Sequence, residues 1–182
     1  MNKTEIFDKI FSQNNDFNYM ALYGWQNDEE TVEYGYLKGY KEAGDNLVEI
    51  AHFGKQDTLI FPIMFLYRQY IEISLKFICT KEFGRIRTKQ LIQKNSHYIN
   101  ELWGEIKDDI SSLGLFSSED FELISQIIDF FANIDDFSMK FRFPWDKNLN
   151  LSLNLQNELR INLEELKKYI DEFDTIISLT YL

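Results

Sequence analysis

The sequence predicts an all-α protein, an up-and-down bundle of about five to six helices, and two observations support this fold class. Apolar residues recur every three to four positions over most of the chain, which is the period of an amphipathic helix. Only eight glycines and two prolines interrupt the 182 residues. The exception is the segment 137–154, where apolar residues alternate, so we expect a short hairpin or an ordered loop there.

The composition favours one domain over residues 1–182. With 45% hydrophobic and 16% aromatic residues, the chain can bury a substantial core. The longest apolar run, Leu59–Tyr67, is far shorter than the roughly twenty residues of a membrane-spanning helix. No export signal opens the sequence, and the single cysteine, Cys79, lies in an apolar run. We therefore expect a soluble cytoplasmic protein with no membrane partner.

The first long helix is expected over about residues 28–52, where apolar side chains keep helical spacing. Three glycines, Gly35, Gly39 and Gly44, fall inside it. Each interior glycine costs about 1 kcal/mol relative to alanine. Either a closely packed neighbouring helix offsets this loss, or the helix is broken there.

The next helix, expected over about residues 58–82, is apolar on almost every side, which predicts a central position in the bundle. Asp57 is the expected N-cap. Its polar exceptions Arg68, Glu72 and Lys76 are four residues apart and therefore share one face. Two interpretations remain open, a ladder of ion pairs within the helix and a groove that faces a polyanion.

The segment 81–94 is a basic patch in an acidic protein. It carries five cations against the one acid Glu82, whereas the whole chain has a net charge of −11; the cations are Lys81, Arg85, Arg87, Lys89 and Lys94. Such a connection is either simply solvated or binds phosphate groups. The overall negative charge argues against a protein that coats nucleic acid or an anionic membrane.

Two more helix starts are expected at Ser96 and Ser117. Ser96 as an N-cap would place His97 in the first turn, where the helix dipole disfavours the charged imidazolium. Ser117 and Asp120 resemble a capping box. The last helix is expected from about residue 155 and carries an apolar seam of Leu155, Leu159, Leu163, Leu166, Ile170, Phe173 and Ile177. This seam either faces the core or forms the interface of a homodimer.

Motifs of established chemistry are missing from the sequence. There is no phosphate-binding Gly-Lys-Ser/Thr loop, no dinucleotide-binding glycine motif and no nucleophile elbow. His52, His97 and Cys79 share no ligand spacing, so we expect no metal site. No cofactor is expected either.

Three short stretches resemble the HEPN superfamily. A Glu-x-x-Leu-Lys pattern precedes a His-x-x-x-x-Leu-Trp pattern, with matching residues Glu72, Leu75, Lys76, His97, Leu102 and Trp103. The run 141–146, Phe-Arg-Phe-Pro-Trp-Asp, resembles a Phe-Arg-Tyr-Pro-x-Asp element of one bacterial branch. Within that run Arg142 and Asp146 flank Pro144, so stabilisation of a turn is the alternative to phosphate contact.

The resemblance implies an all-α bundle of bacterial origin, commonly dimerised, in a superfamily rich in RNA-cleaving toxins, nucleotide-transferase partners and defence-associated proteins. Nuclease members use an Arg-x(4–6)-His motif, which this sequence lacks, since nine residues separate Arg87 from His97. Cleavage is therefore absent, or it requires Arg68 and His97 to meet in space. Such a pair could supply the cation and the titratable group of a metal-independent RNA cleavage.

Three functional hypotheses follow. The favoured one is a HEPN-like module, not an enzyme, that binds a nucleotide, a nucleic acid or a protein partner in a toxin–antitoxin or defence context. The second is a divergent endoribonuclease that uses Arg68, Glu72 and His97. The third is a purely structural helical homodimer. Contacts with RNA or nucleotide phosphates are expected from Lys76, Arg85, Arg87, Lys89 and Arg142.

Overall fold

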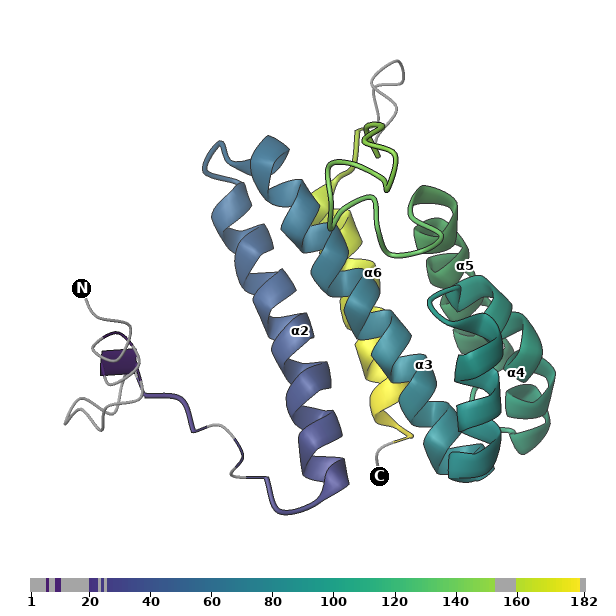
Figure 1. Ribbon diagram of the computed structural model, residues 1–182. Helices are drawn as coiled ribbons and strands as arrows, with labels where there is room; N and C mark the ends of the chain where they lie inside the picture. The colour runs from purple at the N-terminus through teal and green to yellow at the C-terminus, as the bar shows by residue number, and fades with distance from the viewer. Residues whose placement is uncertain are drawn as a thin grey trace. The chain divides into compact units, whose positions relative to one another are not determined.

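The computed structural model describes residues 6, 9, 10, 20–22, 24, 26–152 and 160–180. The chain divides into two units, Met1–Val32 and Glu33–Leu182, and the candidate site lies in the second. The helices are α2 (Glu29–Ala51), α3 (Gln56–Asn95), α4 (Ile99–Leu113), α5 (Ser118–Ile134) and α6 (Leu163–Ser178) (Figure 1). The described residues form no strand, and the predicted all-α fold is confirmed. One domain over residues 1–182 stays a prediction.

Helix α3 holds the centre of the bundle. It packs against both α4 and α6, and α5 joins α4 to α6, so that these four helices enclose the core. Each contributes apolar side chains that are almost completely buried, among them Ile63, Met64, Ile71, Leu75, Ile106, Ile110, Ile124, Ile128, Ile170 and Phe173. The apolar character of α3 on all sides therefore reflects its central place. None of the helices in the described ranges is long and apolar enough to cross a membrane.

Helix α2 tolerates Gly44 because a neighbouring ring occupies the space of a side chain. A Cβ atom at Gly44 would lie 2.6 Å from Cε1 of Tyr67, whereas one at Gly39 would meet nothing within 4 Å. The Tyr67 hydroxyl donates to Asp45 Oδ1 at 2.8 Å. Burial, and then the Asp45 carboxylate, raise the pKa of Tyr67, so the hydroxyl remains a donor at neutral pH. Close packing therefore accounts for the glycine at position 44.

Helix α3 differs from the prediction at both ends. It begins at Gln56, so Lys55 and not Asp57 is the N-cap residue, and Asp57 lies in the first turn. It continues past residue 82 to Asn95, with a kink at Gly84, whose φ of 74° is readily adopted by glycine. The hydroxyl of Thr88 donates to the Gly84 carbonyl at 2.9 Å and satisfies an acceptor at the kink. Helical geometry is interrupted at Gly84 and resumes after it, so most of the basic segment is helical and not a connection.

The predicted position of His97 in the first turn of a helix is wrong. Ser96 ends α3 with φ of 51°, and its amide still donates to the carbonyl of Ile92, which closes the preceding helix. Helix α4 begins only at Ile99. His97 therefore lies in the tight turn between two helices, and Ser96 is not an N-cap. The capping box of Ser117 and Asp120 is confirmed at the start of α5.

Helix α6 starts later than predicted because Asn162 caps it. The Asn162 side chain accepts from the amides of Glu164 and Glu165. The predicted seam positions Leu155 and Leu159 lie outside the described residues. Four later seam residues, Leu166, Ile170, Phe173 and Ile177, are buried within the protomer. The core-facing interpretation is confirmed for these four, which are not available to a dimer interface.

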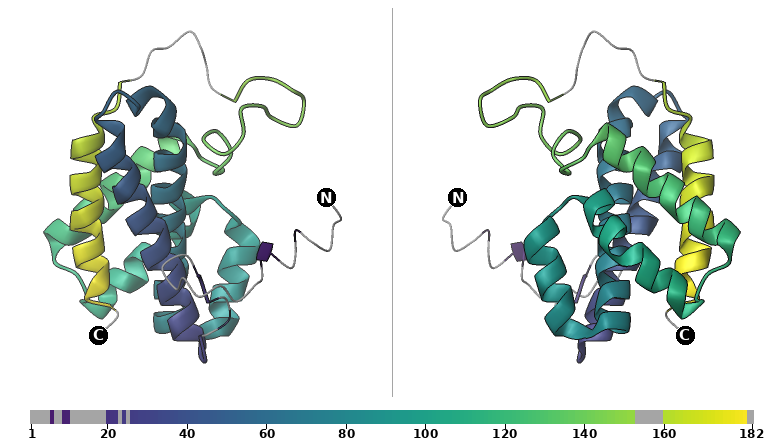
Figure 2. Two further views of the ribbon diagram at one scale, coloured as in Figure 1. Left: turned by 90° about the vertical axis from the view of Figure 1, so that its left-hand side faces the viewer. Right: turned by 90° about the vertical axis from the view of Figure 1, so that its right-hand side faces the viewer.

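The segment after α5 forms an ordered loop through residue 152, and it extends beyond the helices (Figure 2). An antiparallel bridge pairs Trp145 with Leu151. The Asp146 carboxylate accepts from the amides of Asn148 at 2.7 Å and Asn150 at 2.9 Å. Asp146 therefore has the turn-stabilising role. The expected hairpin or ordered loop is present as far as residue 152, and positions 153 and 154 lie outside the described residues.

Candidate functional site

Arg68 ties the middle of α3 to two loops. Its side chain is 0% exposed. Nε donates to the Asp135 carbonyl at 2.8 Å, and Nη1 donates to Oε2 of Glu72 at 2.9 Å. Nη2 donates to the carbonyls of His97 at 2.5 Å and Asp136 at 3.0 Å. One buried guanidinium therefore holds the α3–α4 turn and the start of the loop after α5.

This placement decides what Arg68 can contact. The two residues named by the nuclease hypothesis, Arg68 and His97, do meet in space, but the contact runs through the His97 backbone carbonyl. Each of the three guanidinium nitrogens already donates to a protein oxygen. With no exposed surface, Arg68 cannot bind a phosphate in this conformation.

Glu72 joins three positively charged or donating side chains on one nearly buried carboxylate. Its Oε1 lies 2.5 Å from Nζ of Lys76 and 2.8 Å from Nδ1 of His97, while Oε2 accepts from Arg68. Burial raises the pKa of Glu72, but the opposing effects of Lys76 and His97 outweigh it and leave the pKa below its ordinary value. Glu72 is therefore ionised at neutral pH, and the ladder interpretation of Arg68, Glu72 and Lys76 is correct.

His97 forms the exposed end of this cluster. Its side chain is 49% exposed, and its ring makes an edge-to-face contact with Phe137 at 5.5 Å between centroids. Because an ionised carboxylate can only accept, Nδ1 carries the proton that bonds Glu72. Within the described parts of the chain nothing bonds Nε2, which leaves that nitrogen for a ligand. The imidazole is thus oriented by a buried carboxylate and open to solvent.

The loop beside His97 turns its acidic side chains toward its own backbone. The buried Asp135 accepts from the amides of Met139 at 2.9 Å and Phe141 at 3.4 Å. Asp146 is used in the same way at the tip of the loop. The bonds of the two carboxylates stabilise the loop, and each carboxylate is occupied by amide donors.

The cations and aromatic rings of the same loop remain accessible. No ion pair joins its three cations to any residue that the structure describes; they are Lys140, Arg142 and Lys147. The guanidinium of Arg142 lies 4.9 Å from the ring centroid of Phe143. The exposed aromatic residues are Phe137, Phe143 and Trp145. We call this surface, together with His97 and Lys76, the His97 face.

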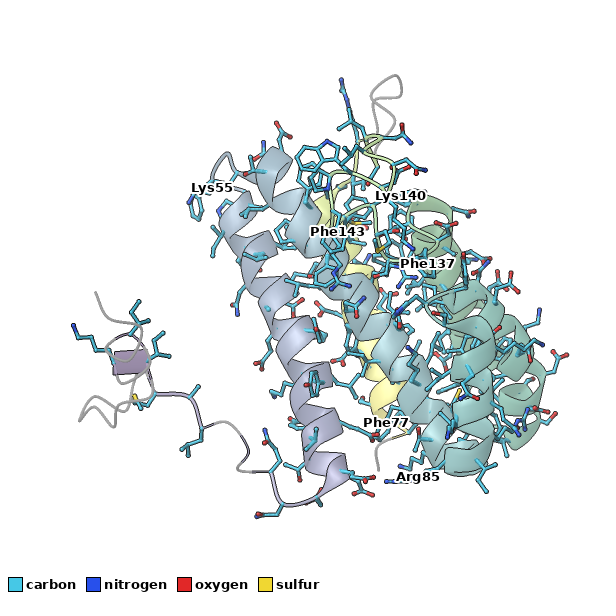
Figure 3. The ribbon with its side chains drawn as sticks, viewed as in Figure 1. Lys55, Phe77, Arg85, Phe137, Lys140 and Phe143 are labelled. Carbon is cyan, nitrogen blue, oxygen red and sulfur yellow. The ribbon has the colours of Figure 1, made fainter. Side chains whose placement is uncertain are left out.

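The basic segment of α3 is partly neutralised by acids of α4. Arg87 pairs with Asp109 of α4, and Lys94 pairs with Glu105 of the same helix. Figure 3 shows Arg85 at the bend of α3, beside the kink at Gly84, and Phe137, Lys140 and Phe143 well away from it. Of the phosphate-binding residues predicted from the sequence, Lys76 and Arg142 belong to the His97 face. In the described residues, Arg87 contacts Asp109 of α4 and the ring of Phe83 instead, and no contact joins Lys89 to the His97 face; Arg85 lies at the bend of α3.

Sequence reasoning missed Lys140, Lys147 and the aromatic members of the His97 face. The signal was present, because cations and aromatic residues alternate over residues 137–147 of an otherwise acidic chain. It was obscured by Asp135, Asp136 and Asp146, which reduce the net charge of the segment although all three accept hydrogen bonds from backbone amides.

No group of three or more potential ligand side chains in the described residues is arranged to hold a metal ion. No family model matches the sequence, and the comparisons with curated proteins and with solved structures gave no match either.

Proposed function

We propose that this chain is a HEPN-like helical module that binds single-stranded RNA on the His97 face without cleaving it. The supporting observation is the loop 135–152, whose acids are occupied by backbone amides while its cations and aromatic rings remain accessible. Single-stranded nucleic acids are held by surfaces of this kind, in which cations contact the phosphates and bases stack on aromatic rings.

The charge distribution restricts binding to this face. The chain carries a net charge of −11, so most of its surface repels a polyanion. On the His97 face the loop carries the cations Lys140, Arg142 and Lys147, and the guanidinium of Arg142 lies 4.9 Å from the ring centroid of Phe143. A short single strand, which can bend away from the acidic surface, suits this small area better than a rigid duplex does.

Binding without cleavage is favoured by the state of Arg68. RNA cleavage by acid–base chemistry needs a cation beside the developing negative charge of the phosphorane. Arg68 is fully buried and donates to three carbonyls and one carboxylate, so it supplies no such charge. Its role is to hold the loop and the His97 turn in place.

The test measures binding of a labelled oligouridylate of about 12 nucleotides, within the site size of a small single-strand binder. Fluorescence anisotropy would compare the wild type with the double variant Lys140→Ala/Arg142→Ala and the single variant Phe143→Ala. We expect the double variant to bind about tenfold more weakly and to show a shallower salt dependence, by about 0.7 for each lost phosphate contact. Phe143→Ala should lose one stacking contact, about 1–3 kcal/mol.

Lys89→Ala is the matched control, because Lys89 is an exposed cation of the basic segment and has no contact with the His97 face among the described residues. It should bind as the wild type does. A wild-type protein that does not bind the oligonucleotide, or a double variant that binds it with unchanged affinity, would contradict the proposal. If Lys89→Ala and the double variant lost equal RNA affinity, the net charge of the protein alone would explain the weaker binding.

A second candidate function, a metal-independent endoribonuclease, is favoured by one observation. His97 is half-exposed, its Nδ1 lies 2.8 Å from the buried Glu72 carboxylate, and Lys76 shares that carboxylate. A carboxylate that orients a histidine is a recurring device of acid–base catalysis. This candidate would be favoured if the wild-type protein cleaved the same RNA in the presence of EDTA. His97→Gln should then abolish the cleavage, and Lys76→Ala should reduce it. Intact RNA after incubation with wild-type protein would dismiss it.

The third hypothesis, a purely structural homodimer, draws support from the buried Arg68 cluster and from the pairing of Arg87 and Lys94 with acids of α4. It does not account for the loop cations that make no ion pair in the described residues. Sedimentation of the full chain would establish its oligomeric state, and a dimer that binds no RNA would favour this hypothesis.

A further inference from the structure

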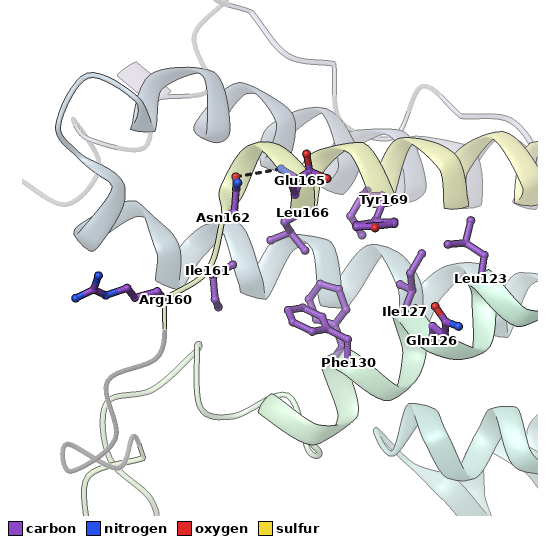
Figure 4. Close-up of a pocket in the computed structure, with 12 residues that line it drawn as sticks. Leu123, Gln126, Ile127, Phe130, Arg160, Ile161, Asn162, Glu165, Leu166 and Tyr169 are labelled. Atoms are coloured by element: carbon purple, nitrogen blue, oxygen red, sulfur yellow. Dashed lines mark hydrogen bonds between the residues drawn. The ribbon is translucent and has the colours of Figure 1, made fainter.

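A groove of about 360 Å³ lies between α5 and α6, apart from the residues of the His97 face (Figure 4). Its base is made of side chains that belong to the core, including Ile127, Leu166 and Ile170. Two aromatic residues stand at its edges, Phe130 of α5 at 37% exposure and Tyr169 of α6 at 45%. The groove thus combines a rigid apolar base with rings that are partly open to solvent.

The surroundings of this groove are mainly acidic. Glu165 lines it directly. Glu165 also borders a second hollow on α6, together with Glu164, Asp171 and Glu172, so an acidic surface continues from the groove along this helix. The cations of this region are Arg160, which lines the groove, and Lys167 and Lys168 of α6. With Glu49 of α2, which borders the same hollow, five acids stand against three cations and give this edge of the bundle a net negative charge.

We propose that this groove docks a basic amphipathic helix of a partner protein. Recognition of this kind places apolar side chains, spaced three and four residues apart, into a groove between two helices. Large anchor side chains would enter the space between Phe130 and Tyr169. Lysine or arginine side chains on the flank of the docking helix that faces α6 would meet Glu165 and Glu172, which select a basic partner over an acidic one.

This inference goes beyond the proposed RNA binding and is independent of it. The groove is built by α5, α6 and the residues just before α6, whereas the His97 face is built by α3, the turn at His97 and the loop 135–152. The two surfaces have opposite charge preferences. A partner helix and an RNA strand could therefore occupy the same molecule.

The probe is a labelled synthetic peptide of about 18 leucine and lysine residues, with leucines at helical i, i+3, i+4 and i+7 spacing and one tryptophan as an anchor. A control peptide of the same composition has its leucines distributed evenly around the helix. Anisotropy titrations with the full chain should show binding of the patterned peptide at least tenfold tighter than binding of the control. The affinity should fall as salt is added, because charged side chains at the edge of the groove contribute.

Two double variants separate the apolar from the electrostatic part. Phe130→Ala/Tyr169→Ala should weaken binding of the patterned peptide at least tenfold, and Glu165→Gln/Glu172→Gln should weaken it several-fold. The matched controls are Tyr36→Ala, an exposed ring on α2, and Asp108→Asn, an exposed acid on α4. Both should bind as the wild type does. Because all of these side chains are exposed, circular dichroism should confirm that every variant is folded.

Four outcomes would overturn the proposal. Three come from peptide binding: a wild-type protein that does not bind the patterned peptide, equal binding of the two peptides, and unchanged binding by Phe130→Ala/Tyr169→Ala. Sedimentation provides a fourth, since a wild-type dimer that the same double variant converts to monomers would mean that a second copy of this chain covers the groove. Loss of peptide binding with RNA binding retained would separate this proposal from that for the His97 face.

Discussion

Two charged regions of one helix, α3, differ in burial: one lies inside the protein and the other lies on its surface. Around Arg68 the charges are interior, with Arg68 itself 0% exposed and Glu72 almost fully buried. Beyond the kink at Gly84 the charges are on the surface, where Arg87 and its partner Asp109 are 43% and 50% exposed. Both regions are candidates for polyanion binding on sequence alone, and in neither is the arginine side chain without a protein partner.

The difference follows from the residues around each charge. Arg68 is flanked by Tyr67, Ile71 and other residues that face the core, so its guanidinium has no route to solvent and must be satisfied inside. Arg87 and Lys94 face α4 across a hydrated surface, where water competes with every ion pair. A charged side chain surrounded by apolar residues therefore links separate parts of the fold. A charged side chain on a polar surface can exchange its ion-pair partner.

The largest effect is expected from Arg68→Ala. The change removes four hydrogen bonds and leaves the Glu72 carboxylate and three backbone carbonyls with fewer donors. Breaking a buried ion pair by removing one partner costs about 3–5 kcal/mol, and we expect the free energy of unfolding to fall by this amount. Urea titrations followed by circular dichroism would measure it.

Arg68→Lys is the control that separates charge from geometry. Lysine keeps the positive charge, but a single ammonium cannot reproduce the planar set of donors that reaches Glu72 and two loops. It should recover only part of the lost stability. A loss below about 1 kcal/mol in Arg68→Ala, within the range of a surface ion pair, would remove the distinction between the two regions.

An intermediate effect, with a pH dependence, is expected from Glu72→Gln. The pKa of Glu72 is lowered in the folded protein, since Lys76 and His97 outweigh the effect of burial. A lowered pKa stabilises the fold above the unfolded-state value of about 4.3, and this stabilisation is lost as the pH falls through the folded value. Glu72→Gln should therefore cost about 1–3 kcal/mol at pH 7 and progressively less below about pH 4.

Urea midpoints of the wild type and Glu72→Gln, measured from pH 7 down to about pH 3, would test this. Asp171 also has a lowered pKa, because Lys167 and Lys41 outweigh its burial, so both proteins should lose stability in acid. Only the difference between them reports on Glu72. A difference that stays constant over the whole range would show that its charge does not contribute.

Local pattern predicted the helices well because α4, α5 and α6 each bury one side of a regular repeat, while α3 is apolar on almost every side over its first part. The same reasoning located the buried stripe of α6 at Leu166, Ile170 and Phe173 and the capping box at Ser117. It failed at Gly84 and Ser96, where single backbone angles decide whether a helix bends or ends. A serine before a polar residue is compatible with either end of a helix, and only the left-handed φ of Ser96 distinguishes them.

The candidate site was predicted only in part because it depends on contacts far apart in sequence. The spacing of Arg68, Glu72 and Lys76 predicted a ladder, and the ladder is present. Nothing local indicates that Arg68 would donate to carbonyls of Asp135 and Asp136, more than sixty positions later. These long-range bonds place the loop beside His97, and so they determine the candidate RNA-binding surface.

The smallest effect is expected for the ion pair of Arg87 with Asp109, and it is the sharpest check on the comparison. Both side chains are about half-exposed, and exposed pairs of this kind contribute about 0.2–1 kcal/mol in double-mutant cycles. A cycle of Arg87→Ala, Asp109→Ala and the double variant should give a coupling in this range, reduced by added salt. A coupling near that of Arg68 with Glu72 would mean that exposure does not govern the strength of charge pairing in α3. A small one would mean that Arg87 can exchange Asp109 for another anion at little cost, which the buried Arg68 cannot do.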